Sequence, residues 1–153
     1  MNTVANSSFG LFVKKNFLDA DLCIRIRSEM SSSGGGPAEI VKTDERPLDE
    51  GIRRTVRKSV SNETLSLLRD KLTGVKSELE TCFGEELSHP QEPQFLFYRT
   101  GDFFHVHVDR GSDPKNPETV KERRVSAILF LNDETEEPGD DTYTGARSSY
   151  TGY

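Results

Sequence analysis

Apolar residues recur at steps of three and four along residues 62–83, and this spacing predicts a long amphipathic helix. Ser61 or Asn62 can cap its first turn, and Gly84 stands where a helix C-terminal cap belongs. A shorter helix is predicted from Asp19, as its cap, to Met30. The apolar positions are Leu65, Leu68, Leu72, Val75, Leu79 and Cys82 in the long helix, and Leu22, Cys23, Ile26 and Met30 in the shorter one. We expect both stripes to pack into a core.

After residue 94 the hydrophobic period changes to two, which is typical of strands. Residues 95–98 and 103–109 predict two strands joined by a turn at 100–102, and residues 124–131 predict a third, largely buried strand. Weaker strand patterns cover residues 9–17 and 52–60. The intervening stretches 31–37, 85–93, 110–122 and 132–141 are predicted to be breaks or loops.

Helices come first and antiparallel strands follow, an order that favours an α+β fold in which helices support one face of a sheet. The 153 residues predict one domain, with a helical part over 1–93 and the first part of a sheet core over 94–153.

Composition narrows the class of protein. Hydrophobic residues make up 33% and charged residues 30%, and no stretch approaches the ~20 apolar residues that a membrane helix needs. No apolar run follows a basic start at the N-terminus, so we expect no signal peptide and a cytoplasmic protein without a membrane partner.

A net charge of -6 argues against nucleic acid as a partner. We interpret the basic run Arg53, Arg54, Arg57 and Lys58 as a solvated face, and Cys23 and Cys82 as free thiols.

His107 and Asp109 form the segment with the strongest chemical signal. On a strand, residues two apart point to the same face with Cα atoms roughly 6–7 Å apart, so the two side chains can converge on one ion. An imidazole and a carboxylate suit a divalent metal such as Fe(II). A histidine and a carboxylate so placed can also be a simple hydrogen-bonded pair, and the tripeptide alone does not choose between them.

The surrounding residues add a longer pattern. Tyr98, Gly101, Phe104, His107 and Asp109 together resemble the metal-site signature of the prolyl-hydroxylase-like group of 2-oxoglutarate/Fe(II) oxygenases. The resemblance covers roughly residues 9–146 and is strongest over 95–132. Its further matches are the helix start at Leu18, Asp19 and Cys23, and then Arg124, Phe130, Leu131, Asn132 and Gly145.

The resemblance implies a double-stranded β-helix, or jelly roll, with supporting N-terminal helices. It implies Fe(II) held by His107, Asp109 and a distal histidine, with 2-oxoglutarate as co-substrate and ascorbate as a further cofactor. Tyr98 would reach toward the co-substrate, and Ile128 and Phe130 would line the pocket. The residues near the metal but not bound to it would be Phe104, which replaces a frequent tyrosine, together with His105 and Arg124. The hydroxylated substrate, protein or small molecule, is left open.

The distal histidine is missing from this pattern, because the three histidines of the chain lie at or before position 107. We therefore expect an incomplete jelly roll in a C-terminally truncated chain. Codon degeneracy allows the tail after Gly145 to be read in a shifted frame as the family's next strand, which would place a single-base frameshift near codons 144–146. The encoding DNA tests this hypothesis: an early stop in the shifted frame, or no later histidine, would refute it.

Other interpretations of the sequence remain open. A non-catalytic, β-rich binding or interaction fragment would also explain a site without its distal histidine. The metallo-β-lactamase motif begins in the same way but continues with histidine where Arg110 stands, and a cupin needs a different spacing from Gly101. His89 lies in a proline-rich connector and is expected to be exposed.

Overall fold

The computed structural model describes residues 3–6, 10–38, 51–105, 107–111, 113–137, 139 and 142–143. Two helices dominate it. Helix α1 spans Ala20–Ser32, and its cap Asp19 accepts a 2.8 Å hydrogen bond from the backbone N–H of Leu22. Helix α2 spans Asn62–Phe83, and the hydroxyl of Ser61 accepts from the N–H of Thr64. Both predicted helices and their caps are confirmed.

Gly84 ends helix α2 with a φ of 66°, and its N–H donates to the carbonyl of Glu80 over 2.9 Å. An L side chain is strained in this left-handed region, so glycine is the residue that this helix end requires. The predicted C-terminal cap is confirmed.

The strands are short. They are β1 (Thr3–Asn6), β2 (Leu11–Lys14), β3 (Gly36–Pro37), β4 (Arg53–Arg54), β5 (Val56–Lys58), β6 (Phe95–Phe97), β7 (Phe103–Phe104), β8 (Asp133–Glu134) and β9 (Thr142–Tyr143), and a one-turn helix α3 covers Glu118–Lys121. Antiparallel pairing joins β1 to β2, β3 to β5, β5 to β6 and β4 to β7, whereas β8 and β9 pair in parallel.

The strand predictions have mixed outcomes. Strand β6 confirms residues 95–98 to within one residue, and β4 and β5 divide the predicted strand over 52–60. Strand β7 covers only the start of residues 103–109. The third strand is wrong: residues 124–131 are all described, none is in a strand, and Ile128 and Phe130 are exposed. Residues 9–17 contain β2, while Phe9 lies outside the described residues.

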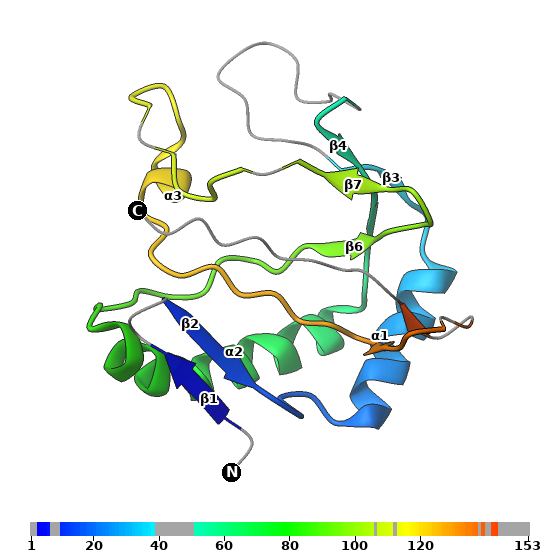
Figure 1. Cartoon of the computed structure of the whole chain (residues 1–153), viewed down its shortest axis with the longest axis horizontal. Coiled ribbons are helices and arrows are strands. Elements are labelled where there is room, and N and C mark those ends of the chain that lie inside the picture. Colours follow the sequence, from blue (N-terminus) through cyan, green and yellow to red (C-terminus); the bar gives the residue numbers. More distant parts are fainter. Residues whose placement is uncertain are drawn as a thin grey trace.

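The core forms where the two helices meet the strands. Leu22, Ile26 and Met30 of α1 pack with Leu18 and with Leu68 of α2. The half-buried side chains against this cluster come from several segments and are Phe17, Cys23, Val60, Phe95, Leu129 and Leu131. Figure 1 shows both helices on one side of β6 and β7, with the β1–β2 hairpin lying across α2. The helices therefore lie against one side of these strands.

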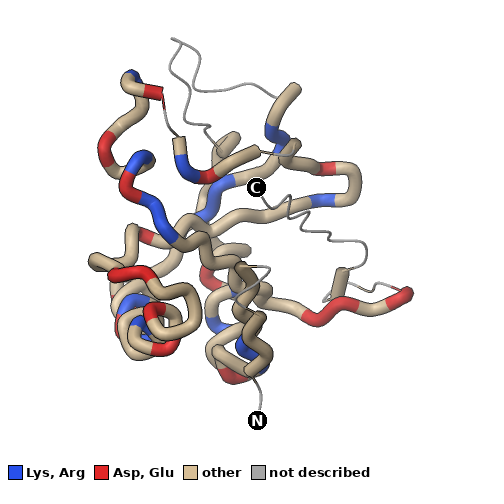
Figure 2. Tube along the Cα trace, turned by 60° about the vertical axis from the view of Figure 1, so that its left-hand side comes forward, with Lys and Arg blue, Asp and Glu red and all other residues tan. Residues whose placement is uncertain are grey.

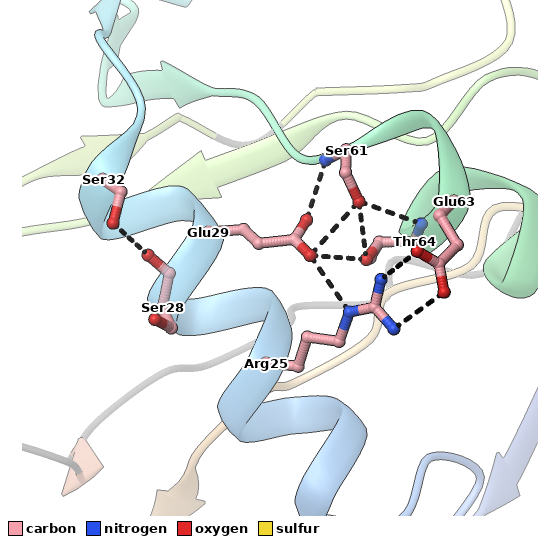
Figure 3. Close-up of polar contacts among 7 residues, drawn as sticks. All are labelled: Arg25, Ser28, Glu29, Ser32, Ser61, Glu63 and Thr64. Carbon is pink, nitrogen blue, oxygen red and sulfur yellow. Dashed lines mark hydrogen bonds and ion pairs between the residues drawn. The ribbon is translucent and has the colours of Figure 1, made fainter.

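A polar cluster fixes α1 to the start of α2 (Figure 3). The carboxylate of Glu29 accepts hydrogen bonds from the backbone N–H and hydroxyl of Ser61 and from the hydroxyl of Thr64. Arg25 donates to Glu29 and to Glu63, so it links the same two helices. The carboxylate of Glu29 therefore joins α1 to the cap and first turn of α2, where a negative charge is favourable.

The described residues therefore combine helices with small, mostly antiparallel sheets, and their strand pairs form no closed barrel. The jelly roll and the division into 1–93 and 94–153 stay predictions. Gly145 and the tail around it lie outside the described residues. No helix in the described part of the chain is both long enough and apolar enough to cross a membrane.

Candidate metal centre

The pairing of β4 with β7 positions the candidate site. Arg53 lies opposite Phe104 and Arg54 opposite Phe103, and the N–H of His105 extends this ladder by donating to the carbonyl of Ile52 over 2.9 Å. The chain therefore leaves β7 in a fixed direction just before His107.

A tight turn precedes β7, as the sequence predicts. Gly101 has a φ of 82°, and the N–H of Asp102 donates to the carbonyl of Arg99 over 2.9 Å. The Asp102 carboxylate accepts from the N–H of Arg99 and from the side chain of Arg54. Because an L side chain is strained at such a φ, the glycine of the Tyr98–Asp109 pattern has a structural role in this turn.

His107 and Asp109 lie side by side. Nε2 of His107 is 3.2 Å from Oδ1 of Asp109, and both side chains are close to half exposed. Nδ1 of the same imidazole is 2.8 Å from the backbone carbonyl oxygen of His105. A carbonyl oxygen only accepts hydrogen bonds, so Nδ1 carries the proton. Nε2 faces the carboxylate as an N–H donor when the ring is an imidazolium and through its lone pair when the ring is neutral, and in the neutral ring a shared cation would join the two acceptors.

The spacing matches neighbouring positions around one ion. Two ligands each about 2.1 Å from a metal and at right angles to each other are separated by about 3.0 Å. The 3.2 Å between Nε2 and Oδ1 is close to this value. Histidine ligands in metal sites also commonly donate their other ring N–H to a carbonyl or carboxylate, as His107 does toward His105. The donor set and its geometry therefore fit two ligands of a divalent metal.

Phe104 fixes the plane of the His107 ring. Their ring centroids are 3.6 Å apart and the planes differ by 20°, so the two rings are stacked. The guanidinium carbon of Arg53 lies 4.6 Å from the centroid of the Phe104 ring. Phe104 thus contacts His107, and its role near a metal stays a prediction. The expectation that the basic run is a solvated face is wrong for Arg53, which is buried.

Arg123 holds the backbone at Asp109. Its Nη1 donates to the carbonyl of Asp109 over 3.1 Å, and its Nε donates to the side chain of Gln91 over 3.0 Å. Gln91 in turn donates to the carbonyl of Thr119. The adjacent Arg124, the residue predicted to lie near the metal, is exposed. The sequence pattern identified Arg124 and did not identify Arg123.

His105 contributes through its backbone. Its carbonyl orients His107, whereas its ring is tilted against Phe103 at a centroid distance of 4.8 Å. The role of His105 near a metal stays a prediction. His89 is exposed, as predicted.

The three residues expected at the co-substrate pocket are all exposed: Tyr98 at 45%, Ile128 at 66% and Phe130 at 53%. The ring of Phe130 stacks on Tyr143 at a centroid distance of 5.5 Å. None of the hydrogen bonds or ring contacts among the described residues joins these three side chains to His107 or Asp109. The pocket role of these three residues stays a prediction.

No group of three His, Cys, Asp or Glu side chains that could hold a metal ion occurs in the part of the chain that the structure describes. Two shallow hollows lie elsewhere on the described surface, and neither includes His107 or Asp109. One, of about 450 Å³, is lined by Ala5, Phe12, Ser77, Glu78, Thr81 and Cys82; the other, of about 320 Å³, by Glu29, Ser32, Ser33, Ser59, Val60 and Ser61. The candidate centre is an open pair of ligands.

Charge is distributed unevenly around this pair. Residues 51–58 and 95–124, which contain β4, β5, β6, β7 and α3, carry ten Lys and Arg against five Asp and Glu, although the whole chain has a net charge of -6. Acidic residues dominate the projecting segment 133–137, seen at the right of Figure 2. These segments therefore carry a net positive charge, which attracts anions to this part of the protein.

Comparison with known proteins adds no relative. No protein-family model matches the sequence, no curated protein matches it, and no solved structure matches the fold. The functional interpretation consequently depends on the residues described above.

Proposed function

We propose that His107 and Asp109 are two ligands of an Fe(II) site in a 2-oxoglutarate-dependent dioxygenase domain of the prolyl-hydroxylase-like group. The observation that carries the proposal is the arrangement of the imidazole. Nδ1 faces a carbonyl at 2.8 Å, and Nε2 on the opposite side of the ring faces a carboxylate oxygen at 3.2 Å. With the ring neutral, a shared divalent cation satisfies Nε2 and the carboxylate without a further protein donor.

Features outside the pair support the same function. The turn at Gly101 and the stack of Phe104 on His107 give structural roles to two further positions of the pattern that resembles these oxygenases. The excess of Lys and Arg in the surrounding segments suits 2-oxoglutarate, which carries two carboxylates.

The bound iron and 2-oxoglutarate would supply the oxidative chemistry that hydroxylates a substrate C–H bond. The chain's own residues would hold and orient them. We propose that Tyr98 contacts the co-substrate, that Ile128 and Phe130 provide apolar surface beside it, and that ascorbate serves as an additional reductant. The distal histidine that completes the site in the family that the sequence resembles is not among the three histidines of this chain, His89, His105 and His107.

An anaerobic titration tests this function. Wild-type protein with both Fe(II) and 2-oxoglutarate should develop a visible metal-to-ligand charge-transfer band that neither addition produces alone. His107→Ala should abolish the band. His105→Ala is the matched control and should retain it, because His105 contacts His107 through its backbone carbonyl. A wild-type protein that binds Fe(II) but gives no band with 2-oxoglutarate would contradict the proposal.

A second candidate function is a non-catalytic binding or interaction domain. It is favoured by the absence, among the described residues, of a third metal-binding side chain beside His107 and Asp109. On this alternative His107 is an imidazolium ion paired with Asp109, and neither Fe(II) nor 2-oxoglutarate binds above the background of the His107→Ala variant.

A further inference from the structure

Two parallel stacks are built on the paired strands β4 and β7. The guanidinium carbon of Arg53 lies 4.6 Å from the centroid of Phe104, and that of Arg54 lies 5.4 Å from the centroid of Phe103. The register places each arginine directly opposite its phenylalanine. Each ring also contacts one histidine: Phe104 contacts His107, and Phe103 contacts His105. The two stacks are therefore closely matched in sequence and in construction.

The stacks differ in burial and in geometry. Arg53 is only 8% exposed, whereas Arg54 is exposed and forms an ion pair with Asp102. A cation near an aromatic ring interacts more strongly when both are withdrawn from water. The Phe104–His107 rings are nearly parallel at 3.6 Å, while Phe103 and His105 are tilted by 48° at 4.8 Å. The Arg53 stack is thus the tighter of the two and the one that ends on a candidate ligand.

We infer that Arg53 is a positioning residue of the metal centre, which acts through Phe104 to hold the His107 imidazole with Nε2 directed at Asp109. The inference rests on the proposed function, in which His107 and Asp109 bind a divalent metal. The terminal torsion of a histidine side chain is broad when nothing restricts it. The Nδ1 hydrogen bond fixes one point of the ring, and the stack on Phe104 fixes its plane. Arg53 covers Phe104 and so limits its motion.

The competing explanation is that Arg53 only stabilises the pairing of β4 with β7. Both explanations predict a loss of stability when Arg53 is replaced, so stability alone does not separate them. Metal affinity and the state of the His107 ring do, because only a positioning role changes them in a protein that is still folded.

The experiment compares Arg53→Met with Arg54→Met, which remove the same group from the two stacks. Mn(II) alone is the probe, and its free concentration is followed by electron paramagnetic resonance at fixed ionic strength. Arg53→Met should weaken Mn(II) binding by about tenfold to a hundredfold, the range found when groups that orient a ligand are removed. Arg54→Met should bind like the wild type. Equal affinities in wild type and Arg53→Met, or equal losses in both variants, would overturn the inference.

Phe104→Leu keeps an apolar side chain and removes the ring, so it should show the same loss of Mn(II) affinity. It decides the question if Arg53→Met does not fold, and unchanged binding by folded Phe104→Leu would also overturn the inference.

If the wild type binds no Mn(II), the proposed function fails, and the His107 ring is then followed in the metal-free protein. Nitrogen-15 spectra of the imidazole should show His107 exchanging between tautomers in Arg53→Met but not in Arg54→Met. If the His107 tautomer is unchanged in Arg53→Met, the positioning role proposed for Arg53 is refuted as well.

Discussion

The carboxylate of Glu29 accepts a 2.7 Å hydrogen bond from the backbone N–H of Ser61, which joins helix α1 to the cap of helix α2. This bond, supported by hydrogen bonds from Thr64, Arg25 and the Ser61 hydroxyl, lowers the pKa of Glu29 from 4.5 to about 2. A carboxyl group whose pKa is lower in the folded state stabilises the fold above its unfolded pKa. That contribution is lost as the pH falls toward the folded pKa.

The first prediction is therefore a loss of stability between pH 4.5 and about 2 that depends on Glu29. Urea unfolding of the wild type should give a falling free energy of unfolding across this window, and Glu29→Gln should lack that part of the decline. Glu63→Gln is the control, because Glu63 is in the same cluster but accepts from Arg25 alone. If the free energy of unfolding of Glu29→Gln falls with pH in the same way as that of the wild type, the role given to this carboxylate is refuted.

The second prediction concerns the core contact of α1. Ile26 is fully buried in the cluster that joins α1, α2 and β6, so Ile26→Ala should lower the free energy of unfolding by about 2–5 kcal/mol. Ile24→Ala is the matched control on the same helix; Ile24 is 55% exposed, and its replacement should change stability by less than about 0.5 kcal/mol. Similar effects of the two variants in denaturant unfolding would contradict the packing of α1.

The third prediction concerns two glycines, Gly74 inside helix α2 and Gly84 at its C-terminal cap. Gly84→Ala should lower the free energy of unfolding by about 1 kcal/mol, because alanine is strained at a φ of 66°. Gly74→Ala should raise it by about 0.5–1 kcal/mol, since an added methyl group meets nothing within 4 Å and alanine favours the helix interior. Chemical denaturation measures both, and changes of the same sign would contradict the end of α2 at Phe83.

The sequence pattern predicted the helices well because their determinants are local. The stripe from Leu65 to Cys82, the cap at Ser61 and the stop at Gly84 lie within one segment, and each acts through neighbours at most a few residues away. The polar cluster around Glu29 was not predicted, because it depends on a contact between residues 32 positions apart.

The strand predicted over residues 124–131 shows that a hydrophobic period of two does not by itself establish a strand. Leu129 and Leu131 pack against the helical core and Ile128 and Phe130 are exposed, so the alternation of a strand is present. A strand also requires a partner at hydrogen-bonding distance along its length, which a period of two does not guarantee. Arg124 shares the exposed side of this segment with Ile128 and Phe130.

At the candidate site, the sequence drew attention to His107, Asp109 and Phe104 but not to the arginines that contact Phe104 and the backbone of Asp109. Arg53 and Arg123 come from segments 54 and 14 positions away from His107 and Asp109, and their neighbours Arg54 and Arg124 are chemically identical. Pairing with β7 distinguishes Arg53 from Arg54, and only the folded structure contains that information.

The most direct test of the account locates a bound ion on the chain. Mn(II) added in small steps to nitrogen-15-labelled protein broadens the amide signals nearest to it. The account predicts that the signals of residues 104–110 broaden first, and that His107→Ala and Asp109→Ala each remove this selectivity. Broadening that begins instead in the acidic segment 133–137, or that is unchanged in both variants, would contradict a metal centre at His107 and Asp109.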